Sequence, residues 1–154
     1  FVRTLVANTG RLAGVKEGQA VIGGNGLIGR IVSVGRVSSR LLLLTDFNSH
    51  VPVLIMPNNK RGILSGNNDD NPVLRFLPKN TVVEEGAEVV TSGDGGQVPI
   101  GIPVGVVRVD DDGRPFVDLQ EELHNLSYVR IISTRDIDPP PRETEAKTLP
   151  ESGR

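Results

Sequence analysis

The sequence predicts an all-β protein, built as a tandem of two small six-stranded β-barrels. Three observations lead to this fold class. One stretch of sequence occurs twice along the chain, which indicates a duplicated unit. The 18 glycines and 11 prolines fall between short runs of Val, Ile and Leu, as expected of many short strands joined by turns. No long segment repeats apolar residues at the three- and four-residue spacing of an amphipathic helix.

The internal repeat relates residues 15–34 to residues 83–109. Both copies begin with a V-x-E-G motif and run into a β-branched strand, and the second copy has eight more residues between its matched glycines, Gly86 and Gly105, than the first has between Gly18 and Gly29. A backbone requirement would be shared by both copies, so we expect the matched glycines and those of the longer turn to be structural turn residues. These are Gly18, Gly29, Gly86, Gly93, Gly96 and Gly105.

The first half of the chain contains six strand candidates, each a short apolar or alternating run that ends at turn residues. They are residues 1–8, 19–23, 27–34, 40–45, 51–56 and 61–65. The last two are joined by a Pro-Asn-Asn-Lys sequence at 57–60, which predicts a hairpin because Asn tolerates positive φ. We therefore expect residues 1–66 to form the first barrel.

An Asn- and Asp-rich segment at 67–73 is the expected linker, and residues 74–135 then supply the second barrel. The strand candidates of this half are residues 73–78, 87–92, 103–109, 115–121 and 127–133. The best helical candidate, residues 121–126, is only about one turn long. Residues 136–154 are Pro-rich and charged without an apolar period, so we expect a tail or linker there.

Composition excludes several function classes. The net charge of -2 gives no basic footprint for nucleic acid, and aromatic residues make up only 3% of the chain. The chain has no cysteine, which excludes disulfides, thiolate zinc sites and cysteine nucleophiles. The longest aliphatic run, Leu41–Leu44, is far shorter than a membrane helix. The sequence starts at Phe1 without a methionine, so we expect it to be a piece of a longer protein.

Two sequence patterns imitate ligand sites. Residues 24–29 match G-x-G-x-x-G, but a β-branched run follows them where a dinucleotide site requires a helix, so a hairpin turn is expected. The aspartates at 110–112 lack the alternating spacing of a calcium loop, and His50 and His124 are far apart in sequence. We expect no metal and no cofactor.

A third pattern imitates a serine protease, because tandem six-stranded barrels are also the chymotrypsin-like layout. Proteases of that class carry a nucleophile in a Gly-Asp-Ser-Gly-Gly loop, whereas this chain reads Gly-Asp-Gly-Gly at 93–96, with no serine. Asp46 and His50 could supply an orienting group and a base, and Ser92 is the nearest hydroxyl. A double barrel without a triad is the expectation. The distance from His50 to any hydroxyl distinguishes a scaffold from the alternatives, a serine hydrolase or a degenerate protease-like binding module.

Six segments resemble the rod-shape-determining protein MreC family in its periplasmic region, over residues 1–134. They are GVKEGQAVI (14–22), NGLIGRIVSV (25–34), SRLLLLTDFNSHVPV (39–53), RGILSG (61–66), VTSGDGGQVPIGIPVGVV (90–107) and SYVRII (127–132). The TD-x-N-S-x-VPV and TSG-x-GG-x-x-P-x-G-x-PVG elements are the most specific of them.

The resemblance implies a non-enzymatic periplasmic scaffold of two β-barrels that maintains rod shape. It implies coupling of the cytoplasmic actin-like MreB system to peptidoglycan synthesis, with MreD, RodZ and the elongation-specific class B penicillin-binding protein as partners. Attachment to the membrane would come from an N-terminal helix and coiled coil outside this sequence. Exposed turn aromatics such as Phe47 are candidate partner contacts, and self-association into dimers or filaments is expected.

Overall fold

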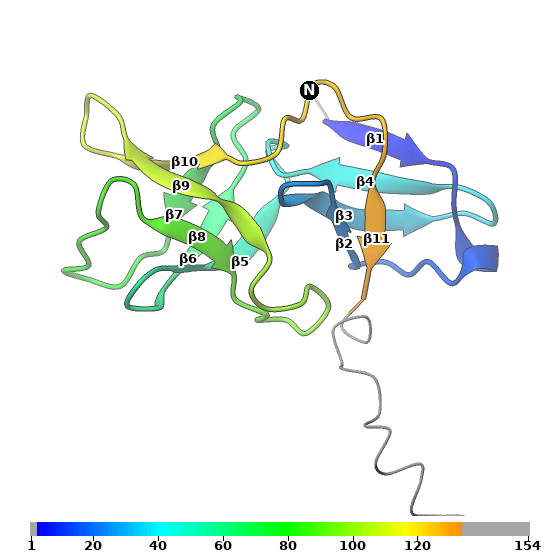
Figure 1. The fold of residues 1–154 in the computed structure, drawn as a ribbon, viewed down its shortest axis with the longest axis horizontal. Helices are drawn as coiled ribbons and strands as arrows, with labels where there is room; N and C mark the ends of the chain where they lie inside the picture. The colour runs from blue at the N-terminus through cyan, green and yellow to red at the C-terminus, as the bar shows by residue number, and fades with distance from the viewer. Residues whose placement is uncertain (1–2, 134–154) are drawn as a thin grey trace, which may run out of the picture.

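The fold consists of a closed β-barrel and an open β-sheet that lie side by side along the long axis of the molecule (Figure 1). In this computed structural model, residues 3–133 are described, and they contain eleven strands and one short 3-10 helix. Each of the eleven expected strand ranges overlaps one of these strands, with three strands starting one residue earlier than expected, and the all-β class is confirmed. The expected tail at 136–154 lies outside the described residues.

The open sheet has five antiparallel strands in the order β1-β4-β3-β2-β11. Their bounds are β1 (Thr4–Ala7), β2 (Ala20–Ile22), β3 (Leu27–Val34), β4 (Ser39–Leu43) and β11 (Arg130–Ile132). The 3-10 helix η1 (Arg11–Ala13) connects β1 to β2 and lies against the turn between β3 and β4, where the amide of Leu12 donates to the carbonyl of Arg36 at 3.1 Å.

The closed barrel has six strands in the cyclic order β10-β7-β6-β5-β8-β9. Their bounds are β5 (His50–Ile55), β6 (Lys60–Ser65), β7 (Val73–Arg75), β8 (Glu88–Thr91), β9 (Pro103–Val109) and β10 (Pro115–Leu119). The expected hairpin at 57–60 joins β5 to β6, with Asn59 at a φ of 54°. Closure satisfies both edges of every strand and leaves no free edge on the barrel.

Two features of the sequence-based fold need correction. The first unit is an open sheet and not a second closed barrel, because its terminal strands β1 and β11 each pair with one neighbour only. The expected boundary at 67–73 does not separate the two sheets either, since β6 before it pairs with β7 after it. Residues 50–65 therefore belong to the barrel, although the sequence assigned them to the first unit.

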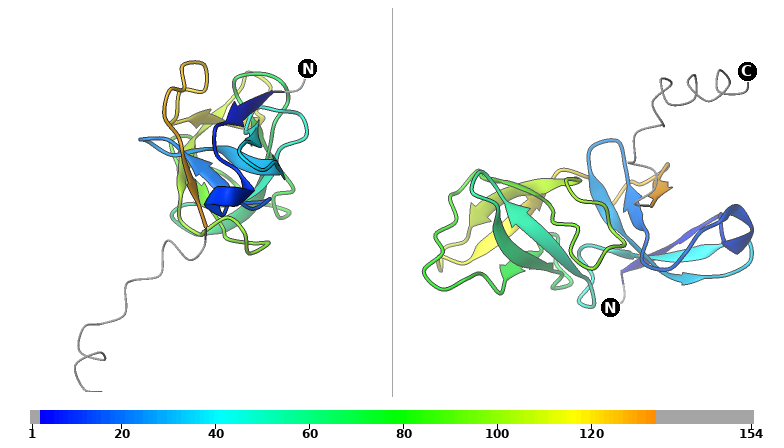
Figure 2. Two further views of the ribbon diagram at one scale, coloured as in Figure 1. Left: turned by 90° about the vertical axis from the view of Figure 1, so that its right-hand side faces the viewer. Right: turned by 90° about the horizontal axis from the view of Figure 1, so that it is seen from below.

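The reason is a reciprocal exchange of strands between the two repeat copies. In each copy, three consecutive strands pair in order, β2-β3-β4 in the sheet and β8-β9-β10 in the barrel. The next strand of the chain then crosses to the other copy: β5 pairs with β8, and β11 pairs with β2. Figure 2 shows this return of the chain, with the orange β11 beside the blue strands of the sheet. The open sheet is therefore built from two separate segments of the chain, whereas the barrel strands β5 to β10 follow one another within residues 50–119.

The hydrophobic core runs through the barrel and continues into the junction with the sheet. Val53 and Val104 of the barrel belong to the same buried cluster as Ala20, Leu27 and Ile132 of the sheet. A second, smaller cluster lies within the open sheet, where Ile28 and Ile31 are fully buried. Burial of aliphatic side chains is the dominant stabilising contribution in both clusters.

Helical structure is limited to η1 within residues 3–133, and the candidate at 121–126 forms an irregular segment instead. This segment carries the chain from the barrel back to the sheet. Among the described residues, no helix has the length and apolar character that crossing a bilayer requires.

Candidate functional site

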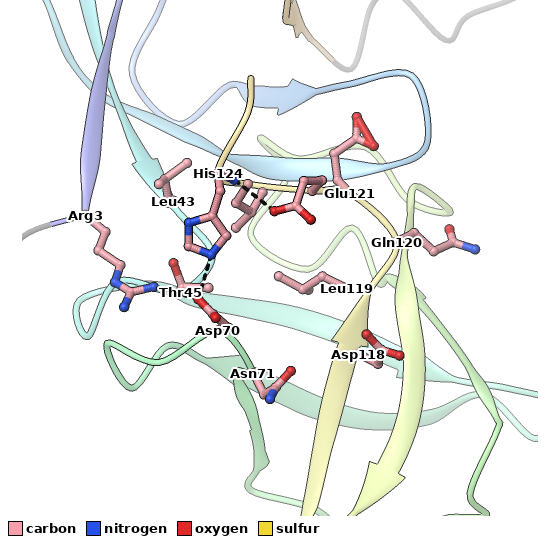
Figure 3. A pocket seen from close by; sticks show the side chains of 12 residues that line it. Arg3, Leu43, Thr45, Asp70, Asn71, Asp118, Leu119, Gln120, Glu121 and His124 are labelled. Atoms are coloured by element: carbon pink, nitrogen blue, oxygen red, sulfur yellow. Dashed lines mark hydrogen bonds and ion pairs between the residues drawn. The ribbon is translucent and has the colours of Figure 1, made fainter. Parts of the chain in front are cut away.

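The candidate site is the junction between the open sheet and the barrel, where polar side chains from three separate parts of the chain meet (Figure 3). Most of them come from the residue before β1, from the turn between β6 and β7, and from the segment that follows β10; Thr45 after β4 and Asp118 in β10 complete the lining. The hollow between them has a volume of about 470 Å³. Its polar lining includes Arg3, Thr45, Asp70, Asn71, Asp118, Gln120, Glu121, Glu122 and His124.

Asp70 connects the other two parts of this junction. Its Oδ1 atom lies 2.9 Å from Nε2 of His124 and 3.4 Å from Nη1 of Arg3 (Figure 3). Arg3 also donates from Nη2 to the carbonyl of Asn68 at 2.7 Å. The hydrogen bond with His124, supported by Arg3, lowers the pKa of Asp70 below its usual value. The group is exposed, so solvent weakens each of these pairs.

Glu121 forms a second connection, and this one is buried. Its Oε2 atom accepts a hydrogen bond from the backbone N–H of Asn25 at 3.1 Å, in the turn between β2 and β3. A Cβ atom on Gly23 would lie 1.6 Å from Oε1 of Glu121, so the glycine leaves room for the carboxylate. The crossing segment is thereby fixed to the β2–β3 turn of the open sheet.

The candidate protease residues do not assemble into a triad. Nδ1 of His50 lies 3.0 Å from Oγ of Ser65, so a hydroxyl is within hydrogen-bond reach, but Ser65 is only 1% exposed and a substrate carbonyl has no access to it. The buried carboxylate of Asp46 accepts from the backbone N–H groups of Asn48, at 2.7 Å, and of Arg3. It forms no hydrogen bond with His50 among the described residues.

Ser92 is occupied in a turn of its own. Its Oγ atom donates to Oδ2 of Asp94 at 3.0 Å and accepts from the Asp94 backbone N–H at 3.2 Å. Arg61 pairs with the same carboxylate and is the main reason that the pKa of Asp94 is lowered, with Ser92 second. The hydroxyl of Ser92 thus donates to Asp94 and not to a histidine, and it lacks the base that activates the serine of a triad.

The patterns that imitate ligand sites form turns. Residues 23–26 form the β2–β3 hairpin turn, where the amide of Gly23 donates to the carbonyl of Gly26 at 2.9 Å, and a strand follows it instead of a helix. In the acidic turn, Oδ1 of Asp110 accepts from the amides of Asp112 and Arg114. Residues 3–133 contain no cluster of three His, Asp or Glu side chains suited to a metal ion.

The repeat glycines Gly18 and Gly86 have the same backbone geometry. Their φ angles are 87° and 86°, and their amides donate to the carbonyls of Ile31 and Val107, at 2.7 and 2.8 Å. Left-handed φ values of this kind favour glycine. Because the two amides donate to matching carbonyls, the two glycines occupy equivalent positions in the two repeat copies.

Gly29 and Gly105 also correspond to each other. A Cβ atom on Gly29 would lie 2.0 Å from the carbonyl oxygen of Leu42, and one on Gly105 would lie 2.1 Å from that of Asp118. Both glycines lie opposite the repeat valines, Val21 and Val89, next to a register shift. The neighbouring strand approaches too closely for any side chain at these positions.

The remaining sequence-derived sites lie in turns. Gly93 and Gly96 have φ angles of 78° and 79° in the long turn between β8 and β9. The side chain of Phe47 is 62% exposed, and its amide donates to Oδ1 of Asn68. The structure brings none of these residues into the junction.

Sequence reasoning missed the junction itself. Asp70 was expected to be only a loop residue, and His124 lay in the expected helical turn. The two are separated by 54 positions along the chain. No local spacing connects them, so only the knowledge that β11 returns to the open sheet could have placed these side chains together.

A family model described as the barrel core of the rod shape-determining protein MreC matches residues 1–133. Among curated relatives, the cell shape-determining protein MreC of Cereibacter sphaeroides is 40% identical over 139 residues, which cover 90% of this chain and 46% of the relative. MreC of Escherichia coli is 41% identical over 135 residues, covering 83% and 37%. The chain thus spans less than half of the length of these relatives.

Solved structures agree with these matches. The structure is similar to MreC from Pseudomonas aeruginosa, with a TM-score of 0.75 and 30% identity over 86% of this chain and 90% of the other. It is also similar to the major periplasmic domain of the cell shape-determining filament MreC, with a TM-score of 0.76 and 26% identity over 86% and 89%. MreC from a Helicobacter pylori complex with penicillin-binding protein PBP2 shares the fold at a TM-score of 0.55 and 23% identity over 68% and 69%.

The match over residues 1–133 covers the open sheet, the barrel and the junction between them. The chain therefore belongs to the rod shape-determining protein MreC family, and corresponds to the periplasmic barrel core of that family.

Proposed function

We propose that this chain acts as a non-enzymatic scaffold of the bacterial cell-elongation machinery, which maintains rod shape by coupling the MreB system to peptidoglycan synthases. The observation that carries the proposal is the family match over residues 1–133, which includes all eleven strands. A scaffold must hold separate binding surfaces at fixed positions. The buried carboxylate of Glu121 and the contacts of Asp70 supply such a fixed junction between the sheet and the barrel.

The first partner in this proposal is the elongation-specific class B penicillin-binding protein, with MreD, RodZ and, indirectly, MreB as further partners. The Helicobacter pylori relative forms a complex with a penicillin-binding protein, which supports this choice of partner class. Phe47 is a suitable anchor, because an exposed aromatic side chain gains much contact area when a partner covers it.

The repeat glycines have a structural role in this proposal. The positive φ angles of Gly18 and Gly86 and the close strand approach at Gly29 and Gly105 support it. Gly93 and Gly96 would shape the long β8–β9 turn in the same way. These positions would set the paths of the strands, while the exposed turns between them contact other proteins.

We also propose that the protein self-associates. The barrel and the open sheet form unlike ends of the molecule, and contacts between unlike surfaces propagate instead of closing. The free edges of β1 and β11 offer a second route to association. Analytical ultracentrifugation of the whole periplasmic region should show dimers or larger species well above micromolar concentration. Monomers alone under those conditions would contradict the proposal.

Binding to the transpeptidase is the central test. We would measure the affinity of the purified chain for the periplasmic part of the class B penicillin-binding protein from the same bacterium. Phe47→Ser should weaken binding by about tenfold or more, as expected for an interface anchor. Phe76→Ser is the matched control, since Phe76 is also an exposed aromatic and directly follows β7 of the barrel. Absence of binding by the unaltered chain would refute the partner assignment.

The hydrolase alternative keeps one supporting observation, the 3.0 Å distance between His50 and Ser65. A serine-reactive phosphonate tests it directly, with mass spectrometry to locate any label. We expect no covalent label on Ser65 or Ser92. Labelling of either serine that disappears in the His50→Ala variant would establish a catalytic pair and overturn the scaffold proposal.

A further inference from the structure

The end of the open sheet farthest from the barrel carries an exposed patch of apolar and basic side chains. Two connections meet there, η1 and the β3–β4 turn, at the right-hand end of the molecule in Figure 1. The amide of Arg11 donates to the carbonyl of Gly35 at 2.8 Å, which holds the two connections together. We call this surface the sheet tip; it consists of Val6, Arg11, Leu12, Arg36, Val37 and Arg40.

Positive charge is concentrated on this side of the molecule. Between Arg3 and Thr45 the sequence has six basic residues and one acidic residue, Glu17. From Asp46 to Ser133 the balance is reversed, with seven basic and thirteen acidic residues. Although the net charge is only -2, the charges are unevenly distributed, with a basic sheet and an acidic barrel.

The three arginines of the sheet tip are available to a ligand. Arg11, Arg36 and Arg40 are all exposed, and none of them forms an ion pair among the described residues. One acid, Glu17, borders a hollow together with Arg11 and Lys16. One carboxylate beside four cationic side chains leaves the sheet tip strongly positive.

Apolar side chains project from the same surface. Leu12 is 68% exposed and Val37 is 65% exposed, and both lie on the touching connections. Val6 is 67% exposed and pairs with Arg40 across the β1–β4 ladder, which puts the two side chains on one face of the sheet. Aliphatic side chains that protrude among arginines match the chemistry of a bilayer surface, where anionic headgroups lie above the acyl chains.

We propose that the sheet tip docks onto an anionic lipid membrane, with its arginines at the headgroups and Leu12 and Val37 inserted between them. A protein partner fits less well, because a stable protein interface covers roughly 800 Å² on each side. The six residues of the sheet tip are far fewer than the roughly 20–30 residues that each side of such an interface contributes. A lipid surface adapts to such a tip, and a few basic residues next to it strengthen binding.

Vesicle sedimentation tests this proposal with the chain as it stands. Vesicles of equal parts phosphatidylglycerol and phosphatidylcholine should sediment the protein, whereas pure phosphatidylcholine vesicles should not, and added salt should release it. The double variant Arg36→Glu/Val37→Ser should lower the partition coefficient by about tenfold or more. The matched control is Arg75→Glu/Phe76→Ser on the barrel, which makes the same charge change and also removes an exposed apolar side chain.

Insertion of the apolar residues is tested separately. The chain has no cysteine, so Val37→Cys and, as control, Phe76→Cys each accept one polarity-sensitive fluorophore. The label at position 37 should shift to shorter wavelength on the mixed vesicles, and the label at position 76 should not.

Three results would overturn the proposal: equal binding to both kinds of vesicle, equal loss in the tip and barrel double variants, or no spectral shift at position 37. Association of the sheet tip with the acidic barrel of a second copy, detected by sedimentation without lipid and abolished by the same tip variant, would assign the surface to self-association instead.

Discussion

The Oδ1 atom of Asp70 lies 2.9 Å from the Nε2 atom of His124, and this contact links the loop between two barrel strands to the segment that returns to the open sheet. Arg3 reaches the same oxygen from the residue before β1. One exposed carboxylate therefore contacts both Arg3 on the sheet side and His124 in the crossing segment. Its protonation should weaken both contacts at once.

Acidification should weaken this junction. The hydrogen bond with His124 lowers the pKa of Asp70 below its usual value of 3.8, so the folded state holds this carboxylate ionised more strongly than the unfolded state. The resulting stabilisation is complete above about pH 4 and is lost as the pH falls through the lowered pKa of the folded protein.

Thermal unfolding between pH 2 and pH 7 measures the effect. The stability difference between the unaltered chain and Asp70→Asn should be largest near neutral pH and should shrink below about pH 4. Asn71→Ala, which changes an uncharged neighbour, should leave the pH profile unchanged. A stability difference for Asp70→Asn that is constant over the whole range would contradict the role assigned to the carboxylate.

Replacing Glu121 should destabilise the protein at neutral pH. Its buried carboxylate accepts the Asn25 amide, and Glu121→Ala would leave that amide without its partner, at a cost of about 1–3 kcal/mol. Glu121→Gln keeps an acceptor oxygen and should lose less. Chemical denaturation measures both variants against Glu85→Ala, an exposed glutamate that should change stability little. Equal losses of stability in all three variants would refute the stabilising role of the hydrogen bond between Glu121 and Asn25.

A methyl group at Gly105 should also destabilise the barrel. The Cβ atom of Gly105→Ala would lie 2.1 Å from the carbonyl oxygen of Asp118, so β9 and β10 must move apart, at a cost of about 1–3 kcal/mol. Gly24→Ala is the control, because a Cβ atom there has no neighbour within 4 Å. If the melting temperatures of the two variants fell equally, the close strand approach would not be the cause.

The strands could be predicted from the sequence because each depends on a local pattern. A run such as residues 103–109 carries its own β-branched residues and its own turn signals, and the hairpin at 57–60 needs only its two asparagines. Pairing is different, because the partner of a strand can lie anywhere in the chain. The repeat correctly indicated duplication, but it could not indicate that β5 and β11 are exchanged between the copies.

The same limit applies to the candidate site. Gly18 and Gly86 could be singled out because the repeat places them in register within the sequence. Asp70 and His124 could not, since they meet only after β11 has returned to the sheet. The open edges of β1 and β11 were also missed, because strand count alone does not determine whether a sheet closes.

Because strands are exchanged between the repeat copies, we expect that the first half of the chain cannot fold without the second. Residues 1–66, the first barrel of the sequence-based fold, contain β5 and β6 but lack β8 and β7, with which those strands pair. They also lack β11, which covers the outer edge of β2. A fragment with so many unpaired edges and an incomplete core should not fold alone.

Fragments 1–66 and 67–133 test this directly. Each fragment alone should give the narrow amide dispersion of an unfolded chain in a two-dimensional NMR spectrum, whereas the continuous chain 1–133 should be well dispersed. Mixing the two fragments should restore the dispersed spectrum, because the exchanged strands then find their partners in trans. If residues 1–66 alone gave a monomer with a well-dispersed spectrum and cooperative unfolding, β5 and β6 would have found other partners. The reciprocal exchange would then not be required for folding.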